Sequence, residues 1–224
     1  MCGRYTYFPA EFADLRVRWN LEGDPPFFAN RYNICPGQNV PVVIQARARN
    51  RLGAMRWGLI PSWAKDEKIG YKMINARVET LTEKPSFRWL VESRRCLILS
   101  NGFYEWRKDG TRKAPVFIYL KTKAIFAFAG LWELWHKADG ERLASCTILT
   151  CGANELMAPI HNRMPVILQP SDESKWLDVA HAPYEPLQPI LASYPADLMS
   201  LHEVSTMVNA PANNRPECIS PNGY

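Results

Sequence analysis

Long apolar runs and the marks of secretion are both missing from this sequence. No stretch reaches about 18 consecutive apolar residues, the length at which a transmembrane helix becomes a candidate, and no basic segment followed by an apolar one opens the chain. None of the six cysteines belongs to a C-x-x-C pair. We therefore expect a cytoplasmic protein with reduced thiols and no membrane partner.

The signatures of common cofactor and catalytic sites are missing as well. The four histidines are isolated, and none lies at a metal-ligand spacing from a cysteine. No phosphate-binding glycine loop, dinucleotide-binding glycine pattern, H-E-x-x-H or G-x-S-x-G occurs, and no internal cysteine has the local signature of a papain-type nucleophile. The sequence therefore predicts neither a metal nor an organic cofactor.

Lysine is absent from the first 60 residues, which contain eight arginines, and the whole chain carries a net charge of +5. Arginine suits bidentate phosphate recognition and stacking on bases better than lysine does. The charge pattern is compatible with a nucleic-acid partner, and equally with an ordinary solvated basic surface.

The sequence does contain enough apolar material for a sizeable core. The chain has 224 residues, of which 47% are hydrophobic, with eight Trp, nine Tyr and nine Phe. Short apolar segments predict strands, and they do not alternate with long helices as in a doubly wound sheet. We predict an α+β fold: a single domain over residues 1–224 with a mainly antiparallel, barrel-like β core and short peripheral helices. Residues 208–224 are expected to form an irregular tail docked on this domain.

Individual segments carry more detailed expectations. The spacing of apolar residues predicts a short helix over residues 9–20, and residues 31–38 are expected to form a loop. Residues 115–120 and 124–130 have the pattern of a β-hairpin, and residues 153–160 have that of a short helix. Further strands are expected at residues 40–45, 96–99 and 145–150.

Cys2 has a chemistry that no internal residue shares. Removal of the initiator methionine, usual before a small residue, would leave its α-amine and its thiol free on one residue; unperturbed, these titrate near ~8 and ~8.5. The amine can attack an aldehyde to form an imine, and the thiol can then close a five-membered thiazolidine. The alternative is that Cys2 is an incidental small apolar residue near a poorly ordered end.

Two polar segments occur inside apolar surroundings. Asn75 and Arg77 are two positions apart, so on an extended segment both point the same way, which would suit a phosphate or sugar backbone. Glu105 lies between Tyr104 and Trp106, where partial desolvation would raise its carboxyl pKa toward a range useful for proton transfer. The alternatives are an ordinary charged surface strand and an exposed edge-strand glutamate.

His161 lies in a loop held by two prolines, where it could move protons near neutral pH; the alternative is a structural histidine that caps a helix C-terminus. Trp57 and Trp63 lie close to Arg56, and aromatic side chains beside arginine offer a stacking platform for unpaired bases. The alternative is that the tryptophans pack in the core, which is the stronger interpretation for Trp57 than for Trp63.

These segments belong to a series that resembles the SRAP family, the SOS response-associated peptidases that include the abasic-site crosslinking proteins. The matching stretches follow the family's order along nearly the whole chain, and the chain is similar to the compact bacterial form. They are MCGRYT (1–6), RYNICPGQNVPVV (31–43), MRWGLIPSWAKD (55–66), INARVET (74–80), RRCLILSNGFYEWRK (94–108), FAGLWE (128–133), ILTCGANELMAPIHNRMPVIL (148–168) and VSTMVN (204–209).

The resemblance implies a specific chemistry. SRAP proteins join abasic sites in single-stranded DNA to the N-terminal cysteine as a thiazolidine, which gives Cys2 the role of nucleophile. Glu105 matches the carboxylate of the family's EWR/EWK motif and would shuttle protons. His161 matches the IHxRMP motif and would assist opening of the sugar ring, while Asn75 would hold the amine and the sugar oxygen. The resemblance further implies DNA contacts by Arg4, Arg77, Arg163, Trp63 and Pro41.

Two other functions stay open at this point. One, implied by the family name, is a thiol peptidase that acts on its own N-terminal segment, and the other is a non-enzymatic module that binds single-stranded DNA. The crosslinking function assumes that Met1 is removed, and its imine intermediate would allow some lyase activity. We further expect a monomer that meets damaged DNA at the nucleoid.

Overall fold

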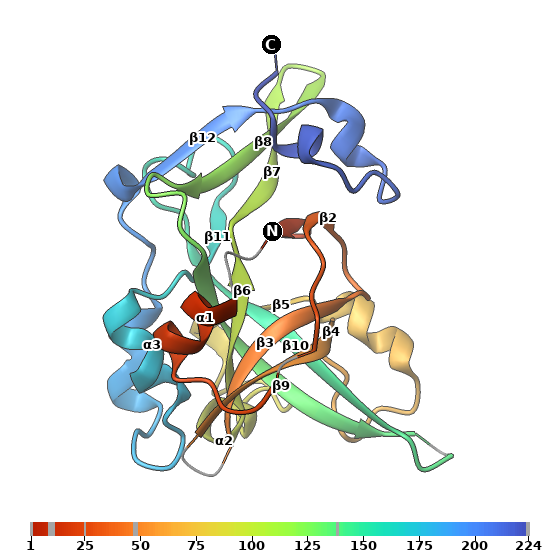
Figure 1. The fold of residues 1–224 in the computed structure, drawn as a ribbon, viewed down its shortest axis with the longest axis vertical. Coiled ribbons are helices and arrows are strands. Elements are labelled where there is room, and N and C mark those ends of the chain that lie inside the picture. The colour runs from red at the N-terminus through yellow and green to blue at the C-terminus, as the bar shows by residue number, and fades with distance from the viewer. Residues whose placement is uncertain (1, 9–11, 25, 47–48, 138, 223–224) are drawn as a thin grey trace.

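The computed structural model describes residues 2–8, 12–24, 26–46, 49–137 and 139–222. Two β-sheets form the body of the protein, and short helices surround them (Figure 1). This arrangement confirms the predicted α+β fold class with a barrel-like, mainly antiparallel core. None of the helices in these ranges combines the length and the apolar character needed to cross a bilayer.

Five strands form a closed barrel. They are β3 (Asn39–Ala46), β4 (Arg49–Trp57), β6 (Arg95–Ser100), β9 (Phe126–His136) and β10 (Arg142–Gly152). Pairing runs β10–β4–β3–β6–β9, and β9 pairs with β10 to close the ring. The β10–β4 pair is parallel, and the other four pairs are antiparallel. Strand β6 is buried along its whole length, as its uninterrupted apolar run predicts.

A second, five-stranded sheet extends from one end of the barrel. Its order is β12–β8–β7–β1–β2, and β7 follows β6 after one intervening residue, so a single stretch of chain runs from the barrel into this sheet (Figure 1). The strands are β1 (Tyr5–Tyr7), β2 (Arg31–Ile34), β7 (Gly102–Asp109), β8 (Arg112–Leu120) and β12 (Met199–Glu203).

Shorter elements complete the molecule. Strand β5 (Asn75–Arg77) pairs parallel to β10, and β11 (Arg163–Pro165) pairs antiparallel to it. The α-helices are α1 (Phe12–Trp19), α2 (Leu90–Ser93) and α3 (Pro170–Leu177). The 3-10 helices are η1 (Glu67–Lys72), η2 (Val78–Thr80), η3 (Glu185–Leu191), η4 (Ala196–Leu198), η5 (Thr206–Asn209) and η6 (Pro216–Ile219).

Most of the predicted elements are present, with three corrections. The helix predicted over residues 9–20 is α1, although residues 9–11 lie outside the described ranges. Residues 31–34 form strand β2 instead of a loop, because they pair with β1. The predicted hairpin of residues 115–120 and 124–130 is wrong, because β8 pairs with β7 and β12 while β9 pairs with β6 and β10. Residues 153–160 form turns and no regular helix.

The C-terminal tail packs on the domain as far as residue 222, where the Asn222 amide donates to the Glu203 carbonyl oxygen. Cys218 of η6 is fully buried in a small apolar cluster with Tyr104, Phe117 and Val208. The tail therefore covers one face of the second sheet at Tyr104 and Phe117.

Candidate functional site

The second sheet places Cys2 beside Glu105. Strand β1 runs antiparallel to β7 with Tyr5 opposite Phe103, and the Tyr104 amide donates to the Arg4 carbonyl at 2.9 Å. This pairing continues the ladder toward the N-terminus and brings Cys2 next to Glu105, whose charge acts on the thiol. The Cys2 side chain is fully buried.

Asn75 fixes the position of Cys2 from a second element. Its Nδ2 donates a hydrogen bond of 2.8 Å to the Cys2 carbonyl oxygen. The pairing of β5 with β10, which sets Asn75 opposite Ile148, holds the amide in place. The Asn75 Oδ1 is buried and has no hydrogen-bond donor near it within the described ranges. Asn75 can therefore accept one further hydrogen bond from a group bound near Cys2.

Glu105 is buried and yet reaches a cleft. Its side chain is only 6% exposed, which excludes the exposed edge-strand alternative. The cleft has a volume of about 490 Å³, and Glu105 lines it together with Trp106, Lys108, Lys113, His161 and Asn209. Glu105 and His161, 56 positions apart in the sequence, thus meet at one cleft.

Burial controls the proton affinities of the two central groups. Burial raises the pKa of the Glu105 carboxyl above its usual value, while the charge of His161 acts in the opposite direction. Burial also raises the pKa of the Cys2 thiol, and the charge of Glu105 adds to this rise. The thiol is therefore neutral at physiological pH, and it must lose its proton to a base when it reacts.

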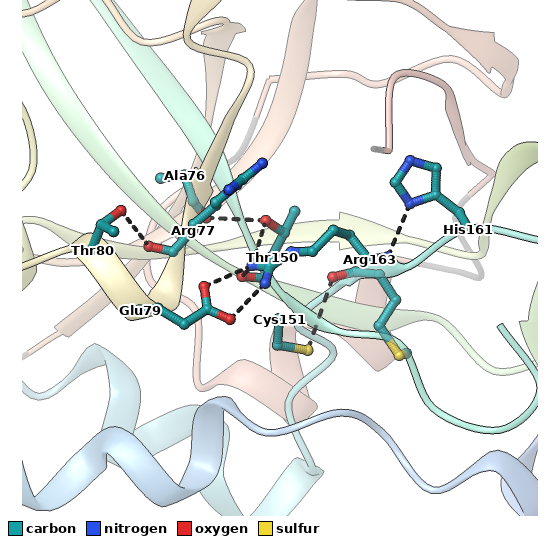
Figure 2. Close-up of polar contacts among 9 residues, drawn as sticks. Ala76, Arg77, Glu79, Thr80, Thr150, Cys151, His161 and Arg163 are labelled. Atoms are coloured by element: carbon teal, nitrogen blue, oxygen red, sulfur yellow. Dashed lines mark hydrogen bonds and ion pairs between the residues drawn. The ribbon is translucent and has the colours of Figure 1, made fainter. Parts of the chain in front are cut away.

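The loop between β10 and β11 orients His161. The Arg163 amide donates a hydrogen bond of 2.9 Å to His161 Nδ1 (Figure 2). Because Nδ1 accepts this bond, the hydrogen of the neutral ring lies on Nε2. His161 is thus held as a proton donor at Nε2 by the backbone of its own loop.

Arg163 itself is engaged by the protein. Its guanidinium forms a bidentate ion pair with Glu79, at 2.5 and 2.9 Å, and donates to the Thr150 carbonyl oxygen at 2.5 Å (Figure 2). Arg4 is likewise engaged, because its Nη1 donates to Asn33 Oδ1 at 2.7 Å and to the Val208 carbonyl oxygen at 2.5 Å.

The remaining predicted DNA-binding residues lie in three different places. Arg77 is exposed on β5, two residues after Asn75. Trp63 is 61% exposed and lines a separate hollow with several lysines, and Pro41 is buried beside a third hollow. Neither Trp63 nor Pro41 is among the residues that line the Glu105 cleft.

Four cleft residues were not predicted as site residues. Trp106 and Lys108 line the cleft from β7, Lys113 lines it from β8, and Asn209 lines it from η5. Asn209 Oδ1 accepts a hydrogen bond of 2.8 Å from Trp106 Nε1. Asn209 is the last residue of the VSTMVN motif, and this position in a family motif could have indicated it as a site residue. In the described part of the chain, no three His, Cys, Asp or Glu side chains gather as a metal site requires.

Comparisons with known proteins agree with the motifs. Residues 1–211 match the family described as SOS response associated peptidase (SRAP). The chain belongs to the SRAP family. It is 50% identical over 222 residues to the abasic site processing protein YoqW of Bacillus subtilis, covering 98% of this chain and 99% of that protein.

More distant members of the SRAP family match as well. The chain is 35% identical over 231 residues to the abasic site processing protein HMCES of Xenopus tropicalis, covering 89% of this chain and 68% of that protein. A crystal structure of a protein from Bacteroides thetaiotaomicron matches with a TM-score of 0.87 at 26% identity, covering 98% of this chain and 99% of that one. Family and fold are thus shown over nearly the whole chain.

Proposed function

We propose that this SRAP protein is a DNA-damage enzyme that captures abasic sites in single-stranded DNA covalently, as a thiazolidine formed by Cys2. The observation that carries the proposal is that Cys2 lies beside Glu105 and is held by Asn75, while Glu105 lines one cleft with His161. Its relatives YoqW and HMCES are named abasic site processing proteins, which supports the same target.

The reaction begins at the amine of Cys2. Met1 lies outside the described residues, and its removal is part of the proposal because only then is the Cys2 nitrogen a free amine. Asn75 holds the residue through the Cys2 carbonyl at 2.8 Å, and its Oδ1 is placed to accept from the amine or from a sugar hydroxyl. His161 Nε2 gives a proton to the ring oxygen of the abasic sugar while the C1′ hydroxyl loses its proton to solvent, which reprotonates His161, so the sugar opens to its aldehyde with no net change in protons.

Glu105 then acts twice. The neutral amine attacks the aldehyde carbon to form a carbinolamine, and the protonated Glu105 carboxyl donates its proton to the departing hydroxyl, which leaves as water. The resulting carboxylate accepts the Cys2 thiol proton as the sulfur adds to the iminium carbon and closes the ring. The sum is aldehyde plus cysteine giving thiazolidine plus water, with Glu105 returned to its starting state.

The lesion itself favours single-stranded DNA as the substrate. An abasic nucleotide has no base to unstack, so entering the cleft costs less than base flipping does. Arg77 is exposed close to Asn75 and is the arginine best placed for a flanking phosphate. Arg4, Arg163, Trp63 and Pro41 stay predicted as DNA contacts.

A second candidate function is autopeptidase activity, which the family's description favours. Its form here would be removal of the protein's own N-terminal segment to expose Cys2, with Glu105 and His161 involved. Lyase activity is a side reaction of the main proposal, because the imine also permits β-elimination until the thiol closes the ring.

A denaturing gel tests the proposal. Untagged wild type, Cys2→Ala and an N-terminally extended protein are incubated with a single-stranded oligonucleotide that carries one abasic site. We expect a heat-stable shifted band with wild type only, because the two variants lack the thiol or the free amine. Cys146→Ala, which removes another buried thiol, should behave as wild type. Binding on a native gel without any shifted band would leave a DNA-binding module instead.

A further inference from the structure

Two lysines face each other at the Glu105 cleft. Lys108 on β7 lies directly opposite Lys113 on β8, both are exposed, and both line the cleft. Residues opposite each other in an antiparallel pair have Cβ atoms roughly 5 Å apart, and like charges at such positions are destabilising. An anion bound between the two ammonium groups would therefore relieve this repulsion.

The other face of the same two strands is arranged differently. Alternate residues of a strand point to opposite faces, so Arg107 lies on the face opposite to Lys108. There Arg107 and Arg112 share Glu203, at 3.2 and 2.6 Å. For Lys108 and Lys113, no carboxylate of the described residues lies within ion-pair distance. Among the described residues, the two arginines of one face thus pair with Glu203, while the two lysines at the cleft form no ion pair.

We propose that Lys108 and Lys113 together bind one backbone phosphate of the DNA strand next to the abasic nucleotide. The inference rests on the proposed function, and it names the anchor for the strand outside the reacting centre. Lys108 is three residues from Glu105, roughly 10 Å along an extended strand. Glu105 lines the same cleft as the two lysines, so a strand whose abasic sugar lies at Glu105 can place a flanking phosphate between them. Lysine suits this role, because it acts as a point charge on a flexible stem and adapts to a mobile backbone.

Equilibrium binding tests the lysine pair separately from the covalent reaction. The probe is a fluorescent single-stranded oligonucleotide with a tetrahydrofuran abasic analogue, which has no aldehyde and forms no imine. K108Q/K113Q is compared with the matched control K121Q/K123Q, which removes two exposed lysines from the segment that follows the far end of β8. Fluorescence anisotropy gives Kd at several salt concentrations.

We expect K108Q/K113Q to bind about tenfold more weakly at low salt. The slope of log K against log salt should fall by about 0.7, the value for one phosphate contact on a single strand. K121Q/K123Q should stay within about twofold of wild type, and K108R/K113R should restore both affinity and slope because the charges return. Equal affinity and slope for K108Q/K113Q and K121Q/K123Q would overturn the proposal.

The two proposals fail in distinguishable ways. If wild type gives no covalent product with a true abasic site, the proposed function fails, whatever the analogue shows. If wild type captures the lesion but K108Q/K113Q binds the analogue like the control, only the lysine pair fails. Both lysines are exposed, so we expect unchanged melting temperatures, and a binding loss then reports on the phosphate contact.

Discussion

The burial of a single residue, Glu105, determines the proton transfers that we propose for this protein. Its carboxyl group is buried, lines the cleft and has a raised pKa. Such a group keeps its proton at a pH where an ordinary glutamate has lost it, so it can act as the acid in imine formation. The neutral Cys2 thiol beside it then needs a base, and the same group, now ionised, can serve.

Replacing Glu105 by Gln should slow capture by about 100-fold, because positioned proton transfer contributes on that order. The rate is measured by quenched-flow or timed gels at saturating protein. Glu155→Gln, at an exposed position, is the matched control and should react as wild type does. Capture by Glu105→Gln at the wild-type rate would remove Glu105 from the mechanism.

The same substitution should stabilise the fold above neutral pH. The folded-state pKa of Glu105 lies above its unfolded value of about 4.3, so wild type loses stability as the pH rises through the folded-state pKa. Gln stays neutral and has no such loss. The melting temperature of Glu105→Gln should therefore exceed that of wild type by a few degrees at pH 8 and by less at pH 5. A difference independent of pH would contradict the raised pKa.

Among the elements, the loop between β10 and β11 is held in position by Arg163. Its guanidinium joins this loop to η2 through Glu79 and to β10 through the Thr150 carbonyl, while its amide holds His161 (Figure 2). Because lysine cannot form the bidentate contact, Arg163→Lys keeps the charge and loosens the loop.

Arg163→Lys should reduce the capture rate about tenfold through misplacement of His161, and leave Kd for the abasic analogue within about twofold. Glu79→Ala removes the carboxylate that pairs with Arg163, and it should give the same slower capture rate. Capture kinetics measure the rate, and fluorescence anisotropy measures Kd. If Kd rises strongly while the rate at saturation is unchanged, Arg163 does not position the loop.

The elements that the sequence predicted well are those defined by local apolar pattern. Strands β3, β6 and β10 contain the predicted segments because each carries a buried run rich in apolar or β-branched residues. Strand β2 was missed because it is short and partly polar. Its Asn33 is buried, and the Nδ2 of this residue donates to three carbonyls of the C-terminal tail. The hairpin was predicted wrongly because the local sequence does not determine which sheet a strand joins.

At the scale of the whole molecule, the site exists only in the complete fold. Cys2, Asn75, Glu105 and His161 come from four segments that β1, β5, β7 and the loop before β11 bring together. Their motifs could be read from the sequence through the family resemblance. The lysine pair could not, because Lys108 and Lys113 become neighbours only through the register of β7 and β8.

The central claim is that Cys2 closes a thiazolidine on the abasic aldehyde, and mass-spectrometric mapping of the crosslink tests it most directly. Wild type and Cys2→Ser react with a single-stranded abasic oligonucleotide without reductant, and both products are digested with protease and nuclease. We predict a sugar adduct on the wild-type peptide that begins at Cys2. Cys2→Ser keeps the amine and lacks the thiol, so it should retain an adduct only after borohydride reduction. An equally stable adduct on Cys2→Ser, or one on another residue of wild type, would contradict the account.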